Sequence, residues 1–380
     1  QQSKAGMKDV VIIGAGARGN RVFAELIATH ESGFALSGVV EPDARRRTAF
    51  QREYGIPDER AFATVDEFVA APRLGDIAFI CSPDPTHFEV CRAVSERGYD
   101  VLIEKPIATN LPDCLALLDL QQTHGNRIFV AHVLRYAPFF RRIKEVVDSG
   151  RLGEVRHLHL TENVGHWHFA HSYVRGNWRR AADSAPIVLT KSSHDLDILY
   201  WLVGRPVRSV SSLGGLSYFT EANAPEGSTE RCIDCPLRGE CLYSATQFYL
   251  NRRVEWPYDV VAPGSRSLAE RERAIAEGPY GRCVWRCDND VADNQTVTLE
   301  FEGGVLATFG LHAHTADNTR RVTVLFDRGE VVGDLRRNRL TVSHFTGLKD
   351  ELLIEEIRLP AAADSHGGGD HALLVTLYEH

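Results

Sequence analysis

The stretch "DVVIIGAGARGN" (residues 9–20) decides the fold of the first part of the chain. A continuous apolar run leads into Gly14-x-Gly16-x-x-Gly19, and apolar residues at helical spacing follow. This order is typical of a strand, a tight turn and a helix. The first glycine permits the turn, the second lets a pyrophosphate approach the backbone, and the third allows close packing of the helix on the strand. We therefore expect this turn, with the adjacent Arg18, to bind the phosphates of a dinucleotide at the start of the helix.

A second predicted strand strengthens this interpretation. "FALSGVV" (residues 34–40) ends just before Glu41, which lies about twenty residues after the glycines, where a carboxylate can bond both ribose hydroxyls of the cofactor. A carboxylate repels a 2′-phosphate, so the sequence favours NAD. Three arginines at positions 45 to 47 keep NADP as the less favoured alternative. Without this second strand, a tight turn that needs a positive φ would explain the glycines equally well.

The alternation of strands and helices continues to about residue 135. "DIAFIC" (76–81), "DVLIE" (100–104) and "RIFVAHV" (127–133) are apolar runs, and helix-like patterns separate them. Such alternation predicts a doubly wound parallel sheet, whose ligand lies outside the carboxyl ends of the strands. The candidate cofactor contacts at these ends are Ser82, Pro83, Thr86, His87, Glu104 and Lys105.

The motifs at these strand ends resemble those of a known family. The glycine-rich turn, "SPDPTH" (82–87), "EKP" (104–106) and "HVLRY" (132–136), in this order, are similar to the Gfo/Idh/MocA family, the glucose-fructose oxidoreductase and inositol dehydrogenase group. The resemblance implies an NAD-dependent oxidoreductase in which Lys105 contacts both the nicotinamide ribose and the substrate, and in which a cis bond often precedes Pro106. A surface ion pair with the preceding glutamate is the structural alternative for this lysine.

Beyond Tyr136 the pattern changes to that of a second domain. An expected helix over 138–149 is followed by several apolar runs that alternate with polar residues and are joined by short loops. We therefore predict an α/β chain with an N-terminal Rossmann domain over residues 7–135 and a C-terminal α+β domain over 136–380, the latter with a largely antiparallel open sheet. The resemblance implies that this sheet closes over the nicotinamide and often packs against a partner subunit. We therefore expect a homo-oligomer, a dimer or a tetramer, formed through the C-terminal sheet.

The stretch "IVLTKSSHDLDILYWLVG" (187–204) carries catalytic candidates of the second domain. It starts like a buried strand and ends like an amphipathic helix. Many relatives carry Asp-x-x-x-His here, but Thr190 takes the aspartate position before His194, and Lys191 comes next. Removal of a hydroxyl proton during hydride transfer needs a base that titrates near neutrality, as histidine does. Lys191 could instead be the base or stabilise an oxyanion, and its structural alternative is a pair with one of the two aspartates of the helix.

A dense group of aromatic and basic residues precedes this stretch. "HWHFAHSYVRGNWRR" (166–180) holds three histidines, two tryptophans and three arginines. Aromatic faces stack on sugar rings, while Arg and His donate hydrogen bonds to hydroxyls or to an anionic group. The predicted substrate contacts are His132, Arg135, His166, Trp167, His171, Arg175 and Trp178. The structural alternative is that the tryptophans lie in the core and the arginines are solvated.

The segment over about 217–292 loses the strand pattern and is predicted to be a cysteine-rich insertion. Its cysteines are Cys232, Cys235, Cys241, Cys283 and Cys287. Thiolates at C-x2-C spacing can share one tetrahedral zinc, and a third and fourth ligand would close a structural site. We predict a structural zinc on the first four of these cysteines, with Cys283 favoured over Cys287 as the last ligand. Five free thiols are the alternative, and an iron–sulfur cluster is less favoured because nothing else in the sequence implies electron transfer.

The composition argues against several other classes of protein. Of the 380 residues, 43% are hydrophobic and 25% are charged, which is ordinary for a soluble globular chain. The net charge of −8 argues against a nucleic-acid binder, because phosphate contacts need a surplus of Lys and Arg. Apolar runs stay shorter than the roughly eighteen residues of a membrane span. No signal-peptide core precedes the first strand, so we expect a cytoplasmic protein without a membrane partner.

These features predict an NAD-dependent enzyme that oxidises a ring hydroxyl, at C3 in the leading interpretation, of a sugar, glycoside or cyclitol, with an anionic sugar as an option. Its predicted catalytic residues are Lys105, Lys191, His194 and Tyr136. One alternative is an NAD-dependent glycoside hydrolase that works by transient oxidation, elimination, water addition and re-reduction. Its acid and bases would come from Lys191, His194, His171 and Tyr136. A second alternative is a non-catalytic protein that senses the cofactor.

Overall fold

The structure, a computed structural model, describes residues 6–29, 32–349, 351–360 and 366–380. The chain divides into two compact units, Gln1–Glu145 with Leu359–His380, and Val146–Arg358. This division differs from the expected one at residues 135 and 136. Helix α6 (Pro138–Asp148) runs across the boundary, and the C-terminal segment belongs to the first unit rather than to the second.

One six-stranded sheet forms the centre of the first unit. Its strands are β1 (Lys8–Ile13), β2 (Phe34–Val40), β3 (Ala61–Phe62), β4 (Ile77–Ile80), β5 (Asp100–Ile103) and β6 (Ile128–Val130). Their order is β3-β2-β1-β4-β5-β6, and the strands pair in parallel. The predicted doubly wound sheet is therefore confirmed. The winding reverses at β1, between β2 and β4, which is where such sheets bind a ligand.

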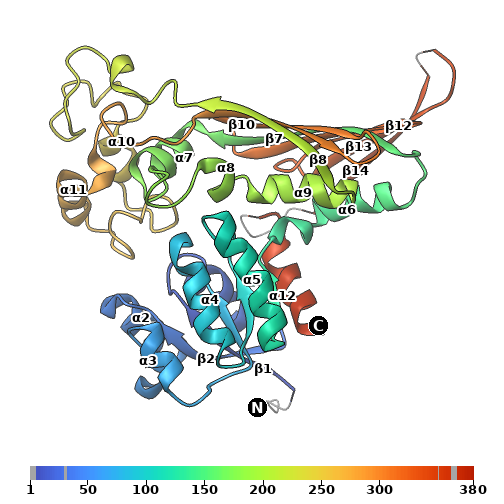
Figure 1. Cartoon of the computed structure of the whole chain (residues 1–380). Coiled ribbons are helices and arrows are strands. Elements are labelled where there is room, and N and C mark those ends of the chain that lie inside the picture. Colours follow the sequence, from blue (N-terminus) through green and yellow to red (C-terminus); the bar gives the residue numbers. More distant parts are fainter. Residues whose placement is uncertain (1–5, 30–31, 350, 361–365) are drawn as a thin grey trace. The chain divides into compact units, whose positions relative to one another are not determined.

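Helices cover both faces of this sheet (Figure 1). They are η1 (Gly19–Ala24), α1 (Glu25–Thr29), α2 (Ala44–Tyr54), η2 (Asp58–Arg60), α3 (Val65–Ala70), η3 (Asp84–Thr86), α4 (His87–Ser95), α5 (Leu111–His124), η4 (Val133–Arg135) and α12 (Gly369–Glu379). Successive residues of β1 point to opposite faces, so Val10 and Ile12 join one buried cluster while Val11 and Ile13 join the other. Leu374 of α12 is fully buried in the first cluster, so the C-terminal helix completes this core.

An eight-stranded sheet forms the centre of the second unit. Its strands are β7 (Val155–Gly165), β8 (Val207–Gly215), β9 (Asn294–Phe301), β10 (Leu306–Thr315), β11 (Thr319–Phe326), β12 (Gly329–Asp334), β13 (Arg339–Phe345) and β14 (Leu352–Arg358). The order is β14-β13-β12-β11-β7-β10-β9-β8; β7 and β10 pair in parallel and the other pairs are antiparallel. The predicted largely antiparallel sheet is confirmed. The edge strand β14 was outside the prediction, because most of its side chains are exposed and it lacks a clear apolar alternation.

The expected strand at residues 187–190 is wrong. Ile187–Thr190 forms the short helix α8, and α9 (Ser193–Val203) follows and lies along one face of the sheet (Figure 1). The amide groups of Leu189 and Thr190 both donate to the carbonyl oxygen of Pro186, which begins a helical turn. A short apolar run such as Ile187 to Leu189 is compatible with a buried strand and with a buried helix, so the sequence alone could not distinguish the two.

The cysteine-rich insertion lies between β8 and β9, at one end of this sheet (Figure 1). Its helices are η6 (Glu221–Asn223), α10 (Ala245–Tyr249), α11 (Leu268–Glu277) and η7 (Pro279–Gly281). The buried carboxylate of Asp293 accepts hydrogen bonds from the amide groups of Ser217, at 3.1 Å, and Tyr218, at 2.7 Å. One carboxylate thus joins the two ends of the insertion.

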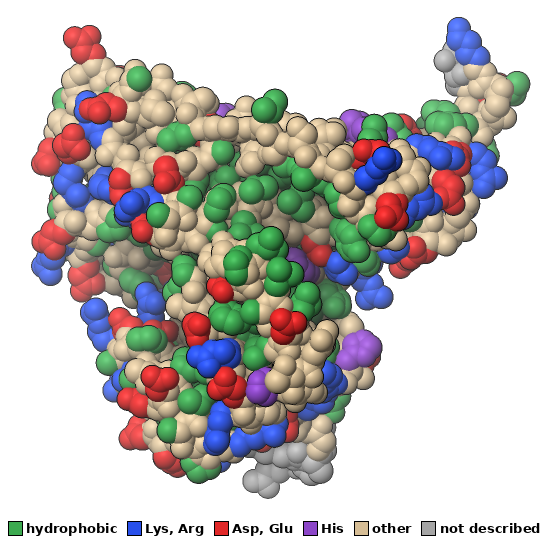
Figure 2. All heavy atoms as spheres, in the orientation of Figure 1, with side chains coloured by type: hydrophobic (Ala, Val, Ile, Leu, Met, Phe, Trp, Pro, Cys, Tyr) green, Lys and Arg blue, Asp and Glu red, His purple; other side chains and the backbone are tan. Residues whose placement is uncertain are grey.

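Charged side chains of both signs are interspersed over the face of the molecule that Figure 2 shows. Several apolar side chains are exposed on the edge strands of the second sheet, among them Val210 and Leu213 of β8 and Leu353 and Ile354 of β14. Over the described residues, none of the helices has the length and apolar character needed to cross a membrane.

Candidate functional site

Two of the three glycines of the glycine-rich turn have no room for a side chain, whereas the remaining one lies in open space. Gly14 has a φ of +96°, and a Cβ there would lie 2.7 Å from the carbonyl oxygen of Cys81. A Cβ on Gly19 would lie 1.9 Å from the carbonyl oxygen of Gly14. By contrast, a Cβ on Gly16 would meet no atom within 4 Å. The first and third glycines are therefore needed for packing, whereas the second leaves the backbone accessible, as the approach of a pyrophosphate requires.

Glu41 lies beside this turn at the carboxyl end of β2. Its carboxylate is buried and accepts hydrogen bonds from the amide groups of Ala15, at 2.8 Å, and Asp43, at 3.0 Å. These two bonds hold the carboxylate where the fold binds an adenosine ribose. The residues present therefore fit a dinucleotide with a free 2′-hydroxyl.

Arg18 connects three segments of the first unit. Its guanidinium forms ion pairs with Glu104, at 2.6 Å, and with Asp370 at the start of α12, at 2.7 Å. Burial alone lowers the pKa of Arg18, but the two carboxylates raise it above its usual range. A permanent cation thus lies next to the glycine-rich turn and ties it to the end of β5 and to the C-terminal helix.

The two loops predicted to bind the cofactor are joined by one histidine. His87 is fully buried, and its ring nitrogens lie 2.9 Å from the carbonyl oxygen of Ser82 and 2.7 Å from that of Pro106. The bond between Lys105 and Pro106 is cis, as the resemblance implied. The hydroxyl of Thr86 donates to the Ser82 hydroxyl at 2.7 Å. The 82–87 loop and the EKP turn therefore form one connected edge at the carboxyl ends of β4 and β5.

The second unit contains a buried network of two cations and two carboxylates. Lys191 Nζ lies 3.2 Å from one oxygen of Glu162, and Arg320 Nη2 lies 2.6 Å from the other. Arg320 Nε in turn donates to Asp195 at 2.7 Å. Glu162 on β7 and Arg320 on β11 were not predicted, because nothing in the sequence indicates which charged strand residues face α9. The network supplies Lys191 with a carboxylate even though Thr190 replaces the aspartate of relatives.

Burial and charge change the pKa values around this network. Burial raises the pKa of Asp195 to about 6, although Arg320 opposes the shift. Burial and the nearby charge of Lys191 lower the pKa of His168 well below its usual range. The Lys191 side chain keeps 17% of its surface exposed, in contrast to the 5% of its partner Glu162. His194, which is 4% exposed, lies in the first turn of α9, three residues further along the chain.

Two of the predicted substrate contacts are used in packing the insertion. The aromatic-basic stretch forms α7 (His166–Phe169) and η5 (Ala170–Arg175), and both His171 and Arg175 are 3% exposed. His171 Nδ1 lies 2.6 Å from the hydroxyl of Tyr249, and burial lowers the pKa of His171 to about 3. The structural alternative considered for this stretch placed the arginines in solvent, whereas Arg175 is buried. Burial also keeps His171 and Arg175 away from the molecular surface.

Other aromatic residues of this stretch remain partly exposed. Trp167 lies 5.8 Å, between ring centroids, from Trp256 of the insertion, which is 43% exposed. Trp256 also lies 5.1 Å from His168 in an edge-on arrangement. His166 lies 6.2 Å from Tyr243, and Trp178 lies 6.1 Å from Tyr173. Trp256 and His168 were not predicted as site residues, and the indole in particular offers an exposed aromatic face on which a sugar ring could stack. The predicted residues His132, Arg135 and Tyr136 lie after β6, at the carboxyl edge of the first sheet.

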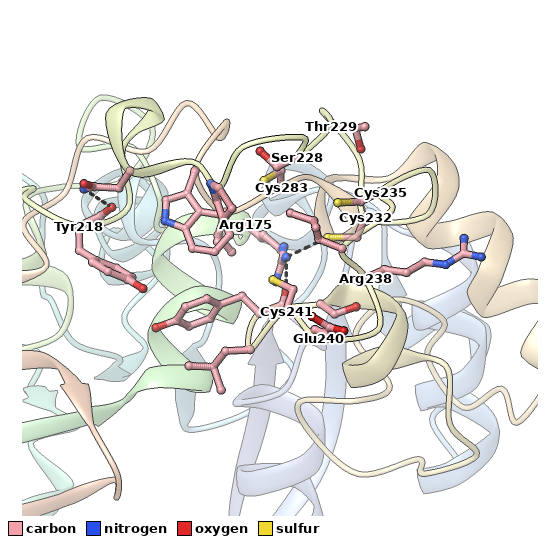
Figure 3. A pocket seen from close by; sticks show the side chains of 18 residues that line it. Arg175, Tyr218, Ser228, Thr229, Cys232, Cys235, Arg238, Glu240, Cys241 and Cys283 are labelled. Carbon is pink, nitrogen blue, oxygen red and sulfur yellow. Dashed lines mark hydrogen bonds between the residues drawn. The ribbon is translucent and has the colours of Figure 1, made fainter.

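Four of the five cysteines of the insertion line one cavity of about 380 Å³ (Figure 3). They are Cys232, Cys235, Cys241 and Cys283. The Cys287 thiol instead donates to the carbonyl oxygen of Cys283, at 3.2 Å. No three His, Cys, Asp or Glu side chains in the described ranges are gathered as the ligands of one metal ion. The expected closed zinc site is therefore not preformed in the described structure.

Two sequence profiles of one family match most of the chain. Residues 8–132 match the profile described as "Oxidoreductase family, NAD-binding Rossmann fold", and residues 144–376 match "Oxidoreductase family, C-terminal alpha/beta domain" of the same Gfo/Idh/MocA group. The two matches cover both units and include the insertion.

Individual proteins are similar at lower identity. The protein YteT of Bacillus subtilis, named as an oxidoreductase without a stated substrate, is 24% identical over 98% of this chain and 89% of its own length. An inositol 2-dehydrogenase of Corynebacterium glutamicum is 29% identical, but over only 53% of this chain and 56% of its own. The solved structure of a levoglucosan dehydrogenase with NADH and levoglucosan has a TM-score of 0.69 and 16% identity, covering 98% of this chain and 89% of that chain. At that identity the structural likeness shows the fold alone.

Proposed function

This chain belongs to the Gfo/Idh/MocA oxidoreductase family, with its NAD-binding Rossmann domain and its C-terminal α/β domain, and on this premise we propose that it oxidises a ring hydroxyl of a sugar or cyclitol with NAD. The observation that carries the proposal is the buried ion pair of Lys191 with Glu162, next to the start of the helix that bears His194. It supplies an oriented cation and a candidate base in one short segment.

The two residues take different roles in the proposed reaction. Glu162 fixes Lys191 as a charged hydrogen-bond donor, which suits polarising a hydroxyl and stabilising the negative charge that develops on its oxygen. His194 then accepts the hydroxyl proton. NAD, when bound, would supply the hydride acceptor that this oxidation needs, so that the secondary alcohol would become a ketone. Lys105, at the cis turn of the EKP motif, is proposed to contact the nicotinamide ribose, as the resemblance implies.

The substrate class rests on the aromatic side chains and on the named relatives. Trp167 and the half-exposed Trp256 provide apolar faces of the kind that stack on sugar rings. An inositol dehydrogenase and a levoglucosan dehydrogenase are among the similar proteins. We propose a neutral sugar or cyclitol, oxidised at C3, as the first substrate to test.

NAD is proposed as the cofactor in preference to NADP. The Glu41 carboxylate is held beside the glycine-rich turn by two amide hydrogen bonds, so a 2′-phosphate would meet a fixed negative charge. Replacing this residue by serine should therefore raise activity with NADP relative to NAD, by about tenfold or more.

The glycosidase alternative needs additional proton-transfer groups. His171 was one candidate, but its Nδ1 faces the hydroxyl of Tyr249, and its pKa of about 3 leaves it a weak base at neutral pH. This observation favours the dehydrogenase over the redox-neutral scheme.

Incubation of the purified chain with free sugars, cyclitols and chromogenic glycosides, with and without NAD, tests the proposal. NADH formation in proportion to ketone supports the dehydrogenase. Aglycone release that depends on NAD but accumulates no NADH would support the glycosidase instead. NADH binding without turnover on any member of the panel would favour a cofactor-sensing protein.

We also propose that the chain assembles through the sheet of its second unit. The exposed apolar side chains of Leu213 on the edge strand β8 and Leu353 on β14 support this, because apolar groups on an edge are usually covered. Light scattering on the wild-type chain gives its mass in solution; a monomer at micromolar concentration would refute the proposal.

A further inference from the structure

The apolar core of the cysteine-rich insertion is small for its length. One buried cluster joins Cys232, Ala245, Tyr249 and Ile275, and further buried apolar side chains in the described part of the segment include Phe219, Val284 and Trp285. Yet the insertion occupies almost eighty positions between β8, which ends at Gly215, and β9, which begins at Asn294. A polar segment of this size usually needs a cross-link or a bound metal in addition to such a small core.

The backbone brings the cysteines together from distant parts of the segment. The amide of Cys232 donates to the carbonyl oxygen of Gly281, and the amide of Cys283 donates to that of Glu230, both at 2.9 Å. These bonds form a short antiparallel bridge that sets Cys232 beside Cys283. Two further turns, with Cys235 bonded to the carbonyl of Cys232 and Cys241 to that of Leu237, direct the other two thiols to the same cavity.

A buried cation lies among these thiols (Figure 3). Arg175 is 3% exposed and donates to the carbonyl oxygens of Arg282 and Tyr243, each at 2.7 Å, and to Cys232 Sγ at 3.5 Å. Among the described residues it forms no ion pair with a carboxylate. A buried guanidinium without a paired anion is costly. Glu240 and Arg238 also line the cavity, and their opposite charges cancel, so the charge of Arg175 still calls for a negative partner there. Cysteines that line the cavity would supply it when a bound metal holds them as thiolates.

We propose that Cys232, Cys235, Cys241 and Cys283 ligate one metal centre through their thiolates, and that Arg175 is its buried counter-charge. Four thiolates around a divalent ion, or around an oxidised iron–sulfur cluster, leave a net negative charge, which the guanidinium partly offsets. Each thiol releases its proton to solvent as it binds the metal. The hydrogen bond to Cys232 Sγ orients that ligand, as partners outside the ligand set commonly do.

The present side-chain positions constrain the nature of this centre. Sulfurs bound to one zinc lie roughly 3.8 Å apart, given a Zn–S distance of about 2.3 Å. No three ligand side chains in the described part of the chain are gathered in this way. Either the thiols turn inward when zinc binds, or the cavity of about 380 Å³ holds an iron–sulfur cluster, which spans a wider cage. The zinc ion and the iron–sulfur cluster would be bound by the same thiolates, and either centre goes beyond the proposed oxidoreductase activity.

Metal analysis of the full chain, expressed and purified without oxygen or chelators, tests the proposal. The expected result is either about one zinc per chain, or about four irons with acid-labile sulfide and a broad visible absorbance. The matched variants are Cys235→Ser and Cys283→Ser, which should lose the metal, and Cys287→Ser and Cys114→Ser, which should keep it, because neither of those thiols lines the cavity. Metal that persists in both Cys235→Ser and Cys283→Ser would overturn the proposal.

Two measurements keep the test decisive if a variant folds poorly. NADH binding reports on the first unit, which lies outside the insertion, and shows whether the rest of the chain is intact. Wild-type protein stripped of metal is also titrated with Zn²⁺ alone and, separately, with iron and sulfide under reducing conditions. If the freshly purified chain holds no metal and takes up neither addition, the proposal is wrong.

Metal retention in variants of Arg175 tests its role as the counter-charge. Arg175→Gln should weaken metal retention against a competing chelator by about 10- to 100-fold, whereas Arg175→Lys, which keeps the charge, should lose less. Equal retention in wild type and Arg175→Gln would show that the guanidinium is not the counter-charge.

Discussion

At the residue scale, buried charges surround Lys191, the proposed catalytic lysine of the second unit. A lysine that is mostly buried needs an anion, and Glu162 supplies it at 3.2 Å. Glu162 also pairs with Arg320, which pairs with Asp195, so the two cations and the two carboxylates balance. The arrangement holds one amine at a defined position, which a solvated lysine on a flexible stem does not achieve.

Lys191→Ala is expected to lower turnover by about two to four orders of magnitude while leaving NADH binding unchanged. The reason is that the cation proposed to polarise the hydroxyl lies in the second unit, whereas the glycine-rich turn lies in the first. Steady-state kinetics with the best substrate of the panel, together with NADH titration, measure both effects. Lys349→Ala, at an exposed position of the same unit, is the control. Near-normal turnover in Lys191→Ala would return this lysine to a purely structural role.

His171 provides a pH prediction at the same scale. Its pKa is lowered to about 3 in the folded chain, whereas an unfolded histidine titrates near 6.5. Between these values the unfolded state binds a proton that the folded state does not, so this residue makes stability fall as the pH decreases from 6.5 toward 3. Its contribution to the loss between pH 7 and pH 5.5 should be about 1 kcal/mol.

Urea unfolding of wild type and His171→Gln at these two pH values tests this assignment. The variant should show the smaller decrease in the free energy of unfolding, by about that amount. His344→Gln, a histidine outside this cluster, should behave like wild type. An identical decrease in wild type and His171→Gln would mean that His171 does not carry this proton linkage.

At the element scale, the insertion depends on a few buried polar groups in addition to a small apolar core. Asp293 binds the amide groups that open the segment, and Arg271, which is fully buried, donates to the carbonyl oxygens of Tyr249, Tyr258 and Ser265. Each of these side chains replaces several backbone hydrogen bonds that a helix or a sheet would otherwise provide. This explains how a segment made of loops and short helices can pack against α7 and η5.

Asp293→Ala should lower the free energy of unfolding of the second unit by about 3 kcal/mol, because it leaves buried amide groups without an acceptor. Hydrogen exchange at residues 217–219, followed by mass spectrometry, should accelerate more than exchange in β10. Glu226→Ala, at an exposed position within the insertion, is the matched control. Unchanged exchange at 217–219 in Asp293→Ala would contradict the role assigned to this carboxylate.

At the scale of the whole molecule, the C-terminal segment Leu359–His380 belongs to the first unit. The last helix, α12, buries Leu373, Leu374 and Leu377 in the core of the Rossmann domain, and Asp370 at its start pairs with Arg18 beside the glycine-rich turn. The glycine-rich turn is therefore tied to a residue more than 350 positions further along the chain, through the contact of Arg18 with Asp370. The helix belongs with the nucleotide-binding domain although the second unit precedes it in the sequence.

Leu374→Ala should lower the free energy of unfolding of the first unit by about 3 kcal/mol, because it leaves a cavity in a fully buried cluster. NADH affinity should fall with it. The neighbouring Val375→Ala is the matched control, since that side chain is 38% exposed and its loss should change stability by less than about 0.5 kcal/mol. Thermal unfolding with and without NADH measures both. Equal destabilisation by the two substitutions would argue against a core position for α12.

The sequence by itself determined the features that depend on local periodicity and on special backbone positions. The Gly14-x-Gly16-x-x-Gly19 turn, the parallel strands and the strand ends at Ser82 and Lys105 follow from spacing and from the need for a Cβ-free backbone. The sequence also predicted the antiparallel strands of the second unit, apart from the exposed edge strand β14.

Only the tertiary structure decided which distant side chains meet. Glu162 and Arg320 carry no local signal of their pairing with Lys191 and Asp195, because an ion pair between strands and a helix depends on how they pack and not on spacing. For the same reason the sequence predicts His171 and Arg175 as sugar contacts, whereas in the fold both side chains contact residues of the insertion, Tyr249 and Tyr243. The helix α12 likewise reveals its domain only through the core that it fills, since burial is a property of the assembled chain.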